Sequence, residues 1–118
     1  MSTITPVEIR LPKGVVQKNI RIQADKISDF CRRWKITEFA LFGSILRDDF
    51  RPDSDIDVLV TFAPDAGWSL FDHVTMQDEL KVIFCRNVDL VSRRGVERSQ
   101  NYIRRKAILS SAQVIYVT

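Results

Sequence analysis

The chain has 118 residues, of which 45% are hydrophobic and 28% are charged, and this is enough for one globular domain with a core of its own. No apolar run approaches the roughly 20 residues that span a bilayer, and the opening segment "MSTITPVEIRLPKG" lacks the apolar region of a secretion signal. We therefore expect a cytoplasmic protein without a membrane partner.

Candidate zinc ligands and basic residues are distributed unevenly. Cys31, Cys85 and the single His73 offer no zinc-ligand spacing, and we expect both cysteines to be reduced core residues, because free cysteine is usually buried. The net charge is only +3, yet the segment "SRRGVERSQNYIRRKAI" holds one acidic residue and six basic ones, which are Arg93, Arg94, Arg98, Arg104, Arg105 and Lys106. Such a local field favours a polyanion or an acidic partner.

Helical and strand patterns alternate along the chain. Apolar residues recur at helical spacing from Ile20 to Trp34, and Ser69 with Asp72 three residues later predicts a capping box at the start of a helix. The expected elements are a helix over 20–34, a strand over 38–42, one or two helical turns over 44–50, a turn over 51–55, a strand over 56–62, a helix over 70–85, a strand over 87–92, a helix over 96–110 and a strand over 113–118.

This alternation predicts an α/β or α+β fold in which helices pack against a sheet. The apolar positions of the helix over 70–85 are Leu70, Val74, Leu80, Ile83 and Phe84. Residues 1–19 are less regular, and the alternating segment "VEIRL" within them could add an edge strand.

Familiar phosphate and calcium motifs are missing. The four glycines are too far apart for GxGxxG, and the sequence has no GxxxxGK[ST]. Asp53, Asp55 and Asp57 fit the first three ligand positions of an EF-hand, but Val58 and Pro64 stand where that loop needs Gly and Glu.

Three aspartates nevertheless occupy costly positions. Asp55 and Asp57 lie two apart at the start of the strand "IDVLVTF", so their side chains point to the same side. Two neighbouring carboxylates repel each other unless a cation lies between them, and oxygen ligands favour Mg²⁺ or Mn²⁺. Asp89 stands between Val88 and Leu90, and it completes a three-carboxylate site if its strand lies beside "IDVLV".

A Gly-Ser pair gives these aspartates a context. Taken singly, "RPDSD" reads as an Asx-rich turn and Asp89 as a strand residue that faces solvent. Gly43 and Ser44, however, leave a strand and open a helical turn, and such a turn presents backbone N–H groups and a hydroxyl to a phosphate. The combination favours a metal and phosphate site.

The segment "FGSILRDDFRPDSDIDVLV" reads as hG[GS] followed by Dh[DE]h, and with the later aspartate of "VDLV" it resembles the nucleotidyltransferase superfamily related to DNA polymerase beta. It is most similar to the minimal nucleotidyltransferases, the MNT-type proteins that are often paired with HEPN-domain partners in toxin–antitoxin systems. The resemblance runs from about Ile20 to Thr118, so residues 20–118 would form the minimal nucleotidyltransferase domain and residues 1–19 an extension.

The resemblance implies one domain of the α+β (α/β) class, with a mixed sheet flanked by helices. It implies that Asp55 and Asp57 bind two Mg²⁺ or Mn²⁺ ions, and that Asp89 joins one ion and helps to activate the acceptor hydroxyl. Gly43 and Ser44 would hold the terminal phosphates of the nucleotide. Arg47 matches the basic residue of "GSxxR", whereas Asp48 stands where many members have Gly.

The implied function is transfer of a nucleoside monophosphate, with AMP from ATP expected, to a hydroxyl such as a tyrosine of a HEPN-type partner, so that the chain acts as an antitoxin. One alternative is a non-catalytic antitoxin that only occludes its partner. Another is a small-molecule nucleotidyltransferase, which the expected lack of a second domain for an acceptor pocket disfavours. A nucleic-acid partner is not expected, and an oligomer stays open.

Overall fold

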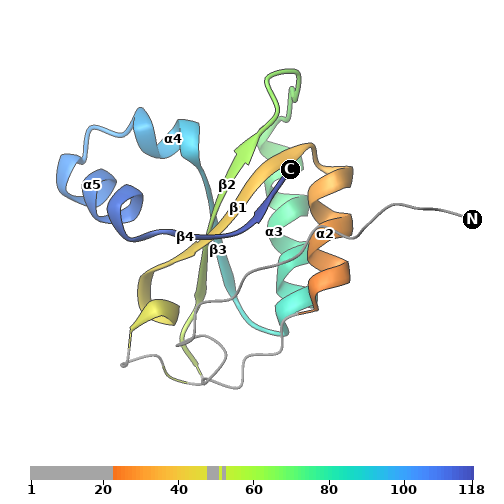
Figure 1. The fold of residues 1–118 in the computed structure, drawn as a ribbon, viewed down its shortest axis with the longest axis horizontal. Coiled ribbons are helices and arrows are strands. Elements are labelled where there is room, and N and C mark those ends of the chain that lie inside the picture. Colours follow the sequence, from red (N-terminus) through yellow and green to blue (C-terminus); the bar gives the residue numbers. More distant parts are fainter. Residues whose placement is uncertain (1–22, 48–50, 52) are drawn as a thin grey trace, which may run out of the picture.

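The computed structural model describes residues 23–47, 51 and 53–118. The predicted extension over 1–19, its "VEIRL" strand and the first residues of the expected helix over 20–34 lie outside the described residues. The described elements, in chain order, are α2 (Ala24–Arg33), β1 (Ile36–Phe42), the 3-10 turn η1 (Gly43–Leu46), β2 (Ile56–Phe62), α3 (Leu70–Phe84), β3 (Val88–Ser92), α4 (Arg93–Glu97), α5 (Tyr102–Ser111) and β4 (Gln113–Val117) (Figure 1).

The strands form one mixed sheet in the order β3-β2-β1-β4. β1 runs antiparallel to both β2 and β4, whereas β2 and β3 run parallel. The parallel pair is possible because α3 connects the two strands and returns the chain to the same end of the sheet. The four predicted strands and the expected mixed sheet flanked by helices are therefore confirmed.

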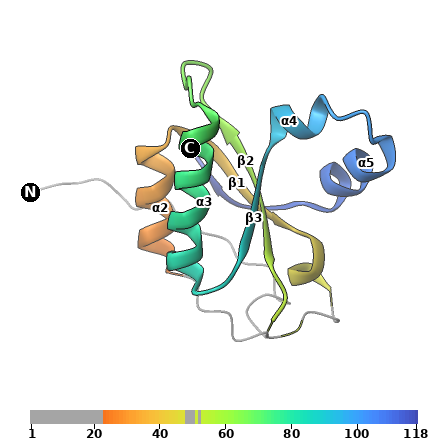
Figure 2. The same cartoon turned by 180° about the vertical axis from the view of Figure 1, so that it is seen from behind.

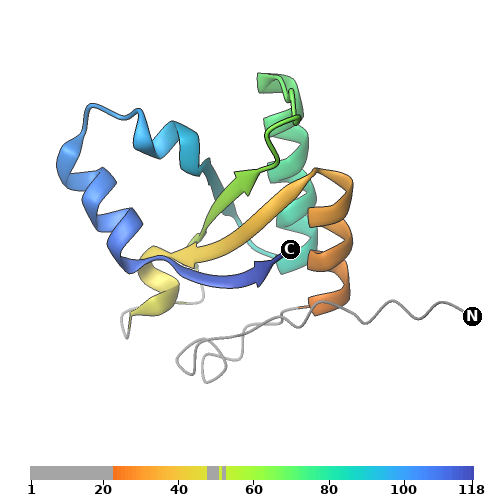
Figure 3. The same ribbon diagram turned by 45° about the horizontal axis from the view of Figure 1, so that its top comes forward.

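Helices cover the two faces of the sheet unequally. α2 and α3 lie side by side over one face, and α4 and α5 lie on the other side (Figures 1, 2 and 3). The main core is under α2 and α3, and it includes Phe39, Leu41, Val58 and Leu90. A smaller core lies under α4 and α5, and it consists of Ala40, Phe42, Leu59, Val96 and Ile108.

Capping residues explain how α3 begins and ends. The hydroxyl of Ser69 accepts a hydrogen bond from the backbone N–H of Asp72, and the Asp72 carboxylate accepts one from the backbone N–H of Ser69 at 2.9 Å. This confirms the predicted capping box. The helix ends at Cys85, whose backbone is left-handed with φ of 54°.

One expectation about a buried side chain was wrong. Cys85 is exposed, because the left-handed turn that ends α3 carries it out of the helical pattern, whereas Cys31 is buried, and burial raises the pKa of its thiol. Leu70 and Val74 are also exposed, because the first turns of α3 extend beyond the core that begins at Met76.

The helix expected over 96–110 is two helices, α4 and α5. Each has its own capping residue: Ser92 Oγ accepts a hydrogen bond from Gly95 N, and Asn101 Oδ1 accepts one from Arg104 N. The polar segment between them therefore starts a second helix instead of continuing the first. Within the part of the chain that the structure describes, no helix is long and apolar enough to cross a membrane.

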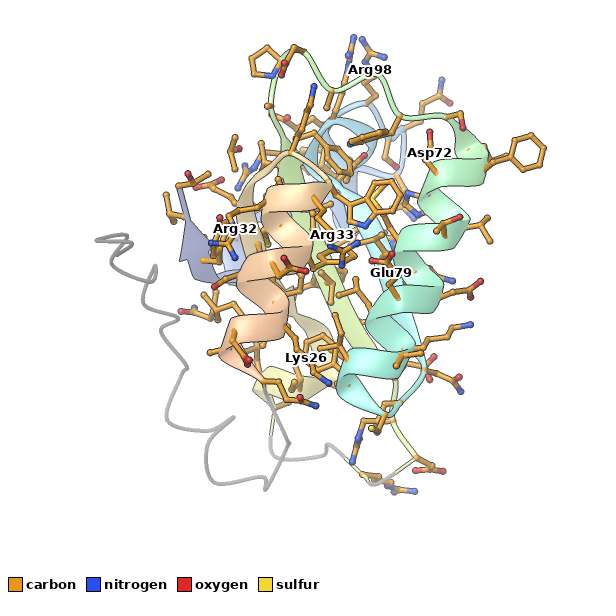
Figure 4. The ribbon with its side chains drawn as sticks, turned by 90° about the vertical axis from the view of Figure 1, so that its right-hand side faces the viewer. Lys26, Arg32, Arg33, Asp72, Glu79 and Arg98 are labelled. Carbon is orange, nitrogen blue, oxygen red and sulfur yellow. The ribbon has the colours of Figure 1, made fainter. Side chains whose placement is uncertain are left out.

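Glu79 ties α2 to α3 at the surface of the main core. Its carboxylate accepts a hydrogen bond from Trp34 Nε1 at 2.9 Å and two from the Arg33 guanidinium, both at 3.2 Å. Figure 4 shows Arg33 and Glu79 facing each other between the two helices. Trp34 also stacks edge-on against Trp68, with 5.0 Å between ring centroids, so this contact links three segments.

We expect Glu79→Ala to lower the free energy of unfolding by about 1–2 kcal/mol, because it removes three charge-assisted bonds between α2 and α3. Glu79→Gln should cost less, since its carbonyl oxygen can still accept the Trp34 bond. Urea unfolding measures both, and Asp78→Ala on the exposed side of α3 is the matched control. Equal losses for Glu79→Ala and Asp78→Ala would mean that the contact does not hold the helices together.

Candidate active site

The parallel pairing of β2 and β3 brings Asp57 and Asp89 together. The two residues are register partners on adjacent strands, and Phe42 at the end of β1 is the partner of Asp57 on the other side. Asp57 lies between Ile56 and Val58, which are fully buried in the main core. Since side chains alternate along a strand, Asp57 and Asp89 point to the opposite face, where α4 and α5 lie.

Gly43 packs directly against Asp57. Its φ is +76°, a backbone conformation that residues other than glycine rarely adopt. A Cβ placed on Gly43 would overlap Oδ2 of Asp57. The glycine therefore serves two purposes at this turn, because it allows the left-handed backbone and leaves room for the carboxylate. The sequence pointed to phosphate binding at Gly43, whereas its contact with Asp57 is a finding of the structure.

The environment of Asp57 disfavours its charged form. Burial raises the pKa of its carboxyl, and the negative charges of Asp89 and Asp55 raise it further. The positive charges of Arg47 and Arg104 lower the same pKa, but the net direction is upward. The three predicted aspartates thus interact with one another, and two arginines act on the same carboxyl.

The remaining predicted residues surround this pair. Asp55 is exposed, just before β2 begins, and Ser44 is half-buried in η1. Arg47 is exposed at the end of η1, and its backbone N–H donates to the carbonyl of Ser44 at 2.9 Å. The structure therefore brings Gly43, Asp57 and Asp89 into one place and puts Asp55 and Arg47 within electrostatic range of Asp57.

Sequence reasoning missed two arginines near the aspartates. Arg86, in the turn after α3, donates from Nη1 to the carbonyls of Arg51 and Ser54, each at 3.2 Å, and so supports the loop that leads into Asp55. No sequence pattern marks that role, because its partners are backbone groups 32 and 35 residues away. Arg104 was noticed only as part of a basic run, yet its Nη2 lies 3.9 Å from Oδ2 of Asp89.

The donor set suits a hard cation, but the carboxylates do not form a finished cage. Among the described residues, no group of three His, Cys, Asp or Glu side chains is placed to hold a metal ion together. Asp57 and Asp89 still fit Mg²⁺ or Mn²⁺ in ligand type and in their adjacent positions. Burial and the charges of Asp89 and Asp55 raise the pKa of Asp57, and a bound cation would offset that effect. The three-carboxylate metal site stays a prediction.

The chain belongs to the nucleotidyltransferase domain family, whose model matches residues 24–115. A relative from Methanocaldococcus jannaschii, named "Putative protein adenylyltransferase MJ1379", is 29% identical over 84 residues, which cover 71% of this chain and 77% of the relative. The resemblance to nucleotidyltransferases that the motifs indicated is thus confirmed, and with it the assignment of the chain as an enzyme of this class.

Solved structures confirm the fold. A "putative minimal nucleotidyltransferase" gives a TM-score of 0.59 at 31% identity and covers 75% of this chain and 85% of its own. A chain of a toxin–antitoxin complex with AMP-PNP gives 0.63 at 23% identity, with coverages of 80% and 73%. A chain of the complex between a tri-AMPylated Shewanella oneidensis HEPN toxin and its MNT antitoxin gives 0.56 at 23% identity, with coverages of 80% and 69%.

Gly43→Ala should lower the free energy of unfolding by roughly 1–3 kcal/mol, because the new Cβ meets both an unfavourable φ and the carboxylate of Asp57. Combining it with Asp57→Ala should recover part of this loss, since only the backbone strain then remains. Gly67→Ala is the control, because a Cβ there meets nothing within 4 Å. Chemical denaturation of the four variants measures the effect, and no recovery in the double variant would contradict the proposed overlap.

Asp57→Asn should make the metal-free protein more stable by about 0.5–1 kcal/mol at neutral pH, because it removes a partly buried charge that two carboxylates repel. A raised pKa in the folded state means that the wild type loses stability as the pH rises through that pKa. The advantage of the variant should therefore vanish as the pH falls, where wild-type Asp57 is protonated as well.

Thermal unfolding in the presence of a chelator, from neutral pH down through the pKa of Asp57, tests the stability difference between Asp57→Asn and wild type. Asp53→Asn is the control, because Asp53 is exposed. An Asp57→Asn protein no more stable than Asp53→Asn at neutral pH would show that the carboxylates do not repel each other appreciably.

Proposed function

We propose that this chain transfers AMP from ATP to a hydroxyl group, with two Mg²⁺ or Mn²⁺ ions held by Asp55, Asp57 and Asp89. The observation that carries this proposal is the register of the parallel strands, in which Asp57 and Asp89 are direct partners beside the Gly43 turn. Divalent ions at such carboxylates supply stabilisation of the attacking and leaving oxygens in phosphoryl transfer. The adenylyltransferase name of the archaeal relative supports AMP as the transferred group.

The residues of the chain then have distinct tasks. The backbone N–H groups and the hydroxyl of the Gly43–Ser44 turn face the terminal phosphates, and Arg47 adds positive charge next to them. The acceptor oxygen bonds to the α-phosphorus, the bond from that phosphorus to the bridging oxygen breaks, and pyrophosphate leaves. Asp89 helps to remove the proton of the acceptor hydroxyl, which finally goes to solvent.

For the acceptor, we propose a tyrosine of a HEPN-type protein, so that AMP transfer neutralises a toxin. Support comes from the structural neighbour in which a tri-AMPylated HEPN toxin is bound to an MNT antitoxin. The arm formed by α4 and α5 lies on the same side of the sheet as Asp57 and Asp89, and it carries Arg93, Arg94, Arg98, Arg104 and Arg105. An acidic partner surface would be drawn toward the site by this charge.

A second candidate function is occlusion of the partner without catalysis. One observation favours it: among the described residues, no three carboxylates are placed to hold a metal ion together. The two functions differ in whether the aspartates are needed.

Incubation with the HEPN-type partner, ATP and Mg²⁺ should add one or more AMP masses to the partner, as intact mass spectrometry would detect. Asp57→Asn and Asp89→Asn should each reduce the addition by at least about 100-fold, because each removes a charge needed to organise the transition state. Asp53→Asn should retain it. If Asp57→Asn protects cells from the partner as well as wild type does, occlusion and not AMP transfer is the mechanism.

A further inference from the structure

Arg104 forms an ion pair with a predicted metal ligand. Its Nη2 lies 3.9 Å from Oδ2 of Asp89, and its charge also lowers the pKa of Asp57. Asp57 and Asp89 are strand partners, so one guanidinium acts on both carboxylates and offsets part of their negative charge. A divalent cation held by the same carboxylates would have to share this space with a positive charge.

The Arg104–Asp89 pair contributes little to the fold. Its side chains are 56% and 49% exposed, and ion pairs with such exposure are typically worth about 0–1 kcal/mol. The next residue is different, because Arg105 donates to the carbonyls of Glu97 and Ser99 and lies over the Tyr102 ring. Arg105 therefore fixes the connection between α4 and α5, whereas Arg104 points its charge at the site.

The backbone of Arg104 is held in place, whereas its side chain has room to move. Its backbone N–H is held by the Asn101 cap at 3.1 Å, so the residue stays at the start of α5. The side chain lines a hollow of about 280 Å³ between β3, α4 and α5, together with Ser92, Ser99 and Ile108. The guanidinium can thus leave Asp89 without any change in the helix that carries it.

We propose that Arg104 is an internal counter-ion, which neutralises Asp89 before a divalent cation binds and moves onto the anionic nucleotide once the cation has taken its place. This inference rests on the proposed function, because it assigns a second partner to the same carboxylates. It gives Arg104 a role in nucleotide binding that differs from that of Arg47, which lies at the Gly43–Ser44 turn on the other side of Asp57 in the sequence.

The counter-ion role predicts effects of opposite sign in two titrations. Without nucleotide, Arg104 repels an incoming cation and must give up its pair with Asp89, so removing its charge should tighten cation binding. With nucleotide, the same charge attracts the phosphates, so removing it should weaken nucleotide binding. A residue with a merely structural role would weaken both.

The experiment uses Mn²⁺ and ATP with the full chain. Binding of Mn²⁺ alone is followed by the electron paramagnetic resonance signal of the free ion, and binding of ATP at saturating Mn²⁺ by calorimetry. R104Q should bind Mn²⁺ about 5- to 10-fold more tightly and ATP more weakly by a similar factor, as expected for one partly screened charge. R104K should stay close to wild type in both titrations.

Lys106→Gln is the matched control, because it removes one charge from an exposed position of the same helix. It should change neither titration by more than about 2-fold. Thermal unfolding verifies that each variant is folded, which the exposure of Arg104 leads us to expect.

The outcomes separate this inference from the function on which it rests. If R104Q behaves like Lys106→Gln, changes only one titration or shifts both in the same direction, the counter-ion role is overturned while the proposed function stands. If wild type binds neither Mn²⁺ nor ATP, the proposed function fails and the counter-ion role fails with it.

Discussion

The parallel pairing of β2 with β3 is the constraint on which the candidate site depends. It places Asp57 opposite Asp89, although the two lie far apart in the chain, and it requires α3 as the crossover between the strands. A slip of one residue in this register would separate the aspartates. It would also turn the apolar side chains of one strand away from the main core, toward the opposite face of the sheet. The buried neighbours of each aspartate prevent such a slip, because Ile56 and Val58 on β2 and Val88 and Leu90 on β3 all belong to the main core.

The energetic cost of the site is local. Asp57 is partly buried beside two like charges. Position 43 must be glycine, because a Cβ there would overlap the carboxylate of Asp57. Two arginines reduce this cost from different directions, since Arg47 follows η1 and Arg104 comes from α5. Partly buried carboxylates that repel each other favour a bound cation, so the features that lower stability are also those that the proposed metal site would use.

Stability comes mainly from the face that carries no site. α2 and α3 bury the larger core, and Glu79 joins them through Trp34 and Arg33 (Figure 4). The face with Asp57 and Asp89 has only the small core under α4 and α5. This division leaves α4 and α5 with many exposed residues, among them Tyr102 and Ile103 beside Arg104, on the side where substrates would approach.

The sequence by itself determined the strands, the α3 capping box and the family, because alternation, capping residues and the aspartate motif are local patterns. It also pointed to Asp57 and Asp89, which are strand partners in the structure, since a carboxylate inside an apolar strand is a local anomaly. Only the tertiary structure decided that Asp89 is the partner of Asp57, that Gly43 makes room for a carboxylate, and that Arg86 and Arg104 support the site. Those contacts join residues distant in the chain, and no periodicity encodes them. The same reason explains the error at Cys85 and the exposure of Leu70 and Val74, because burial at these positions depends on where α3 leaves the core and not on the pattern of the helix itself.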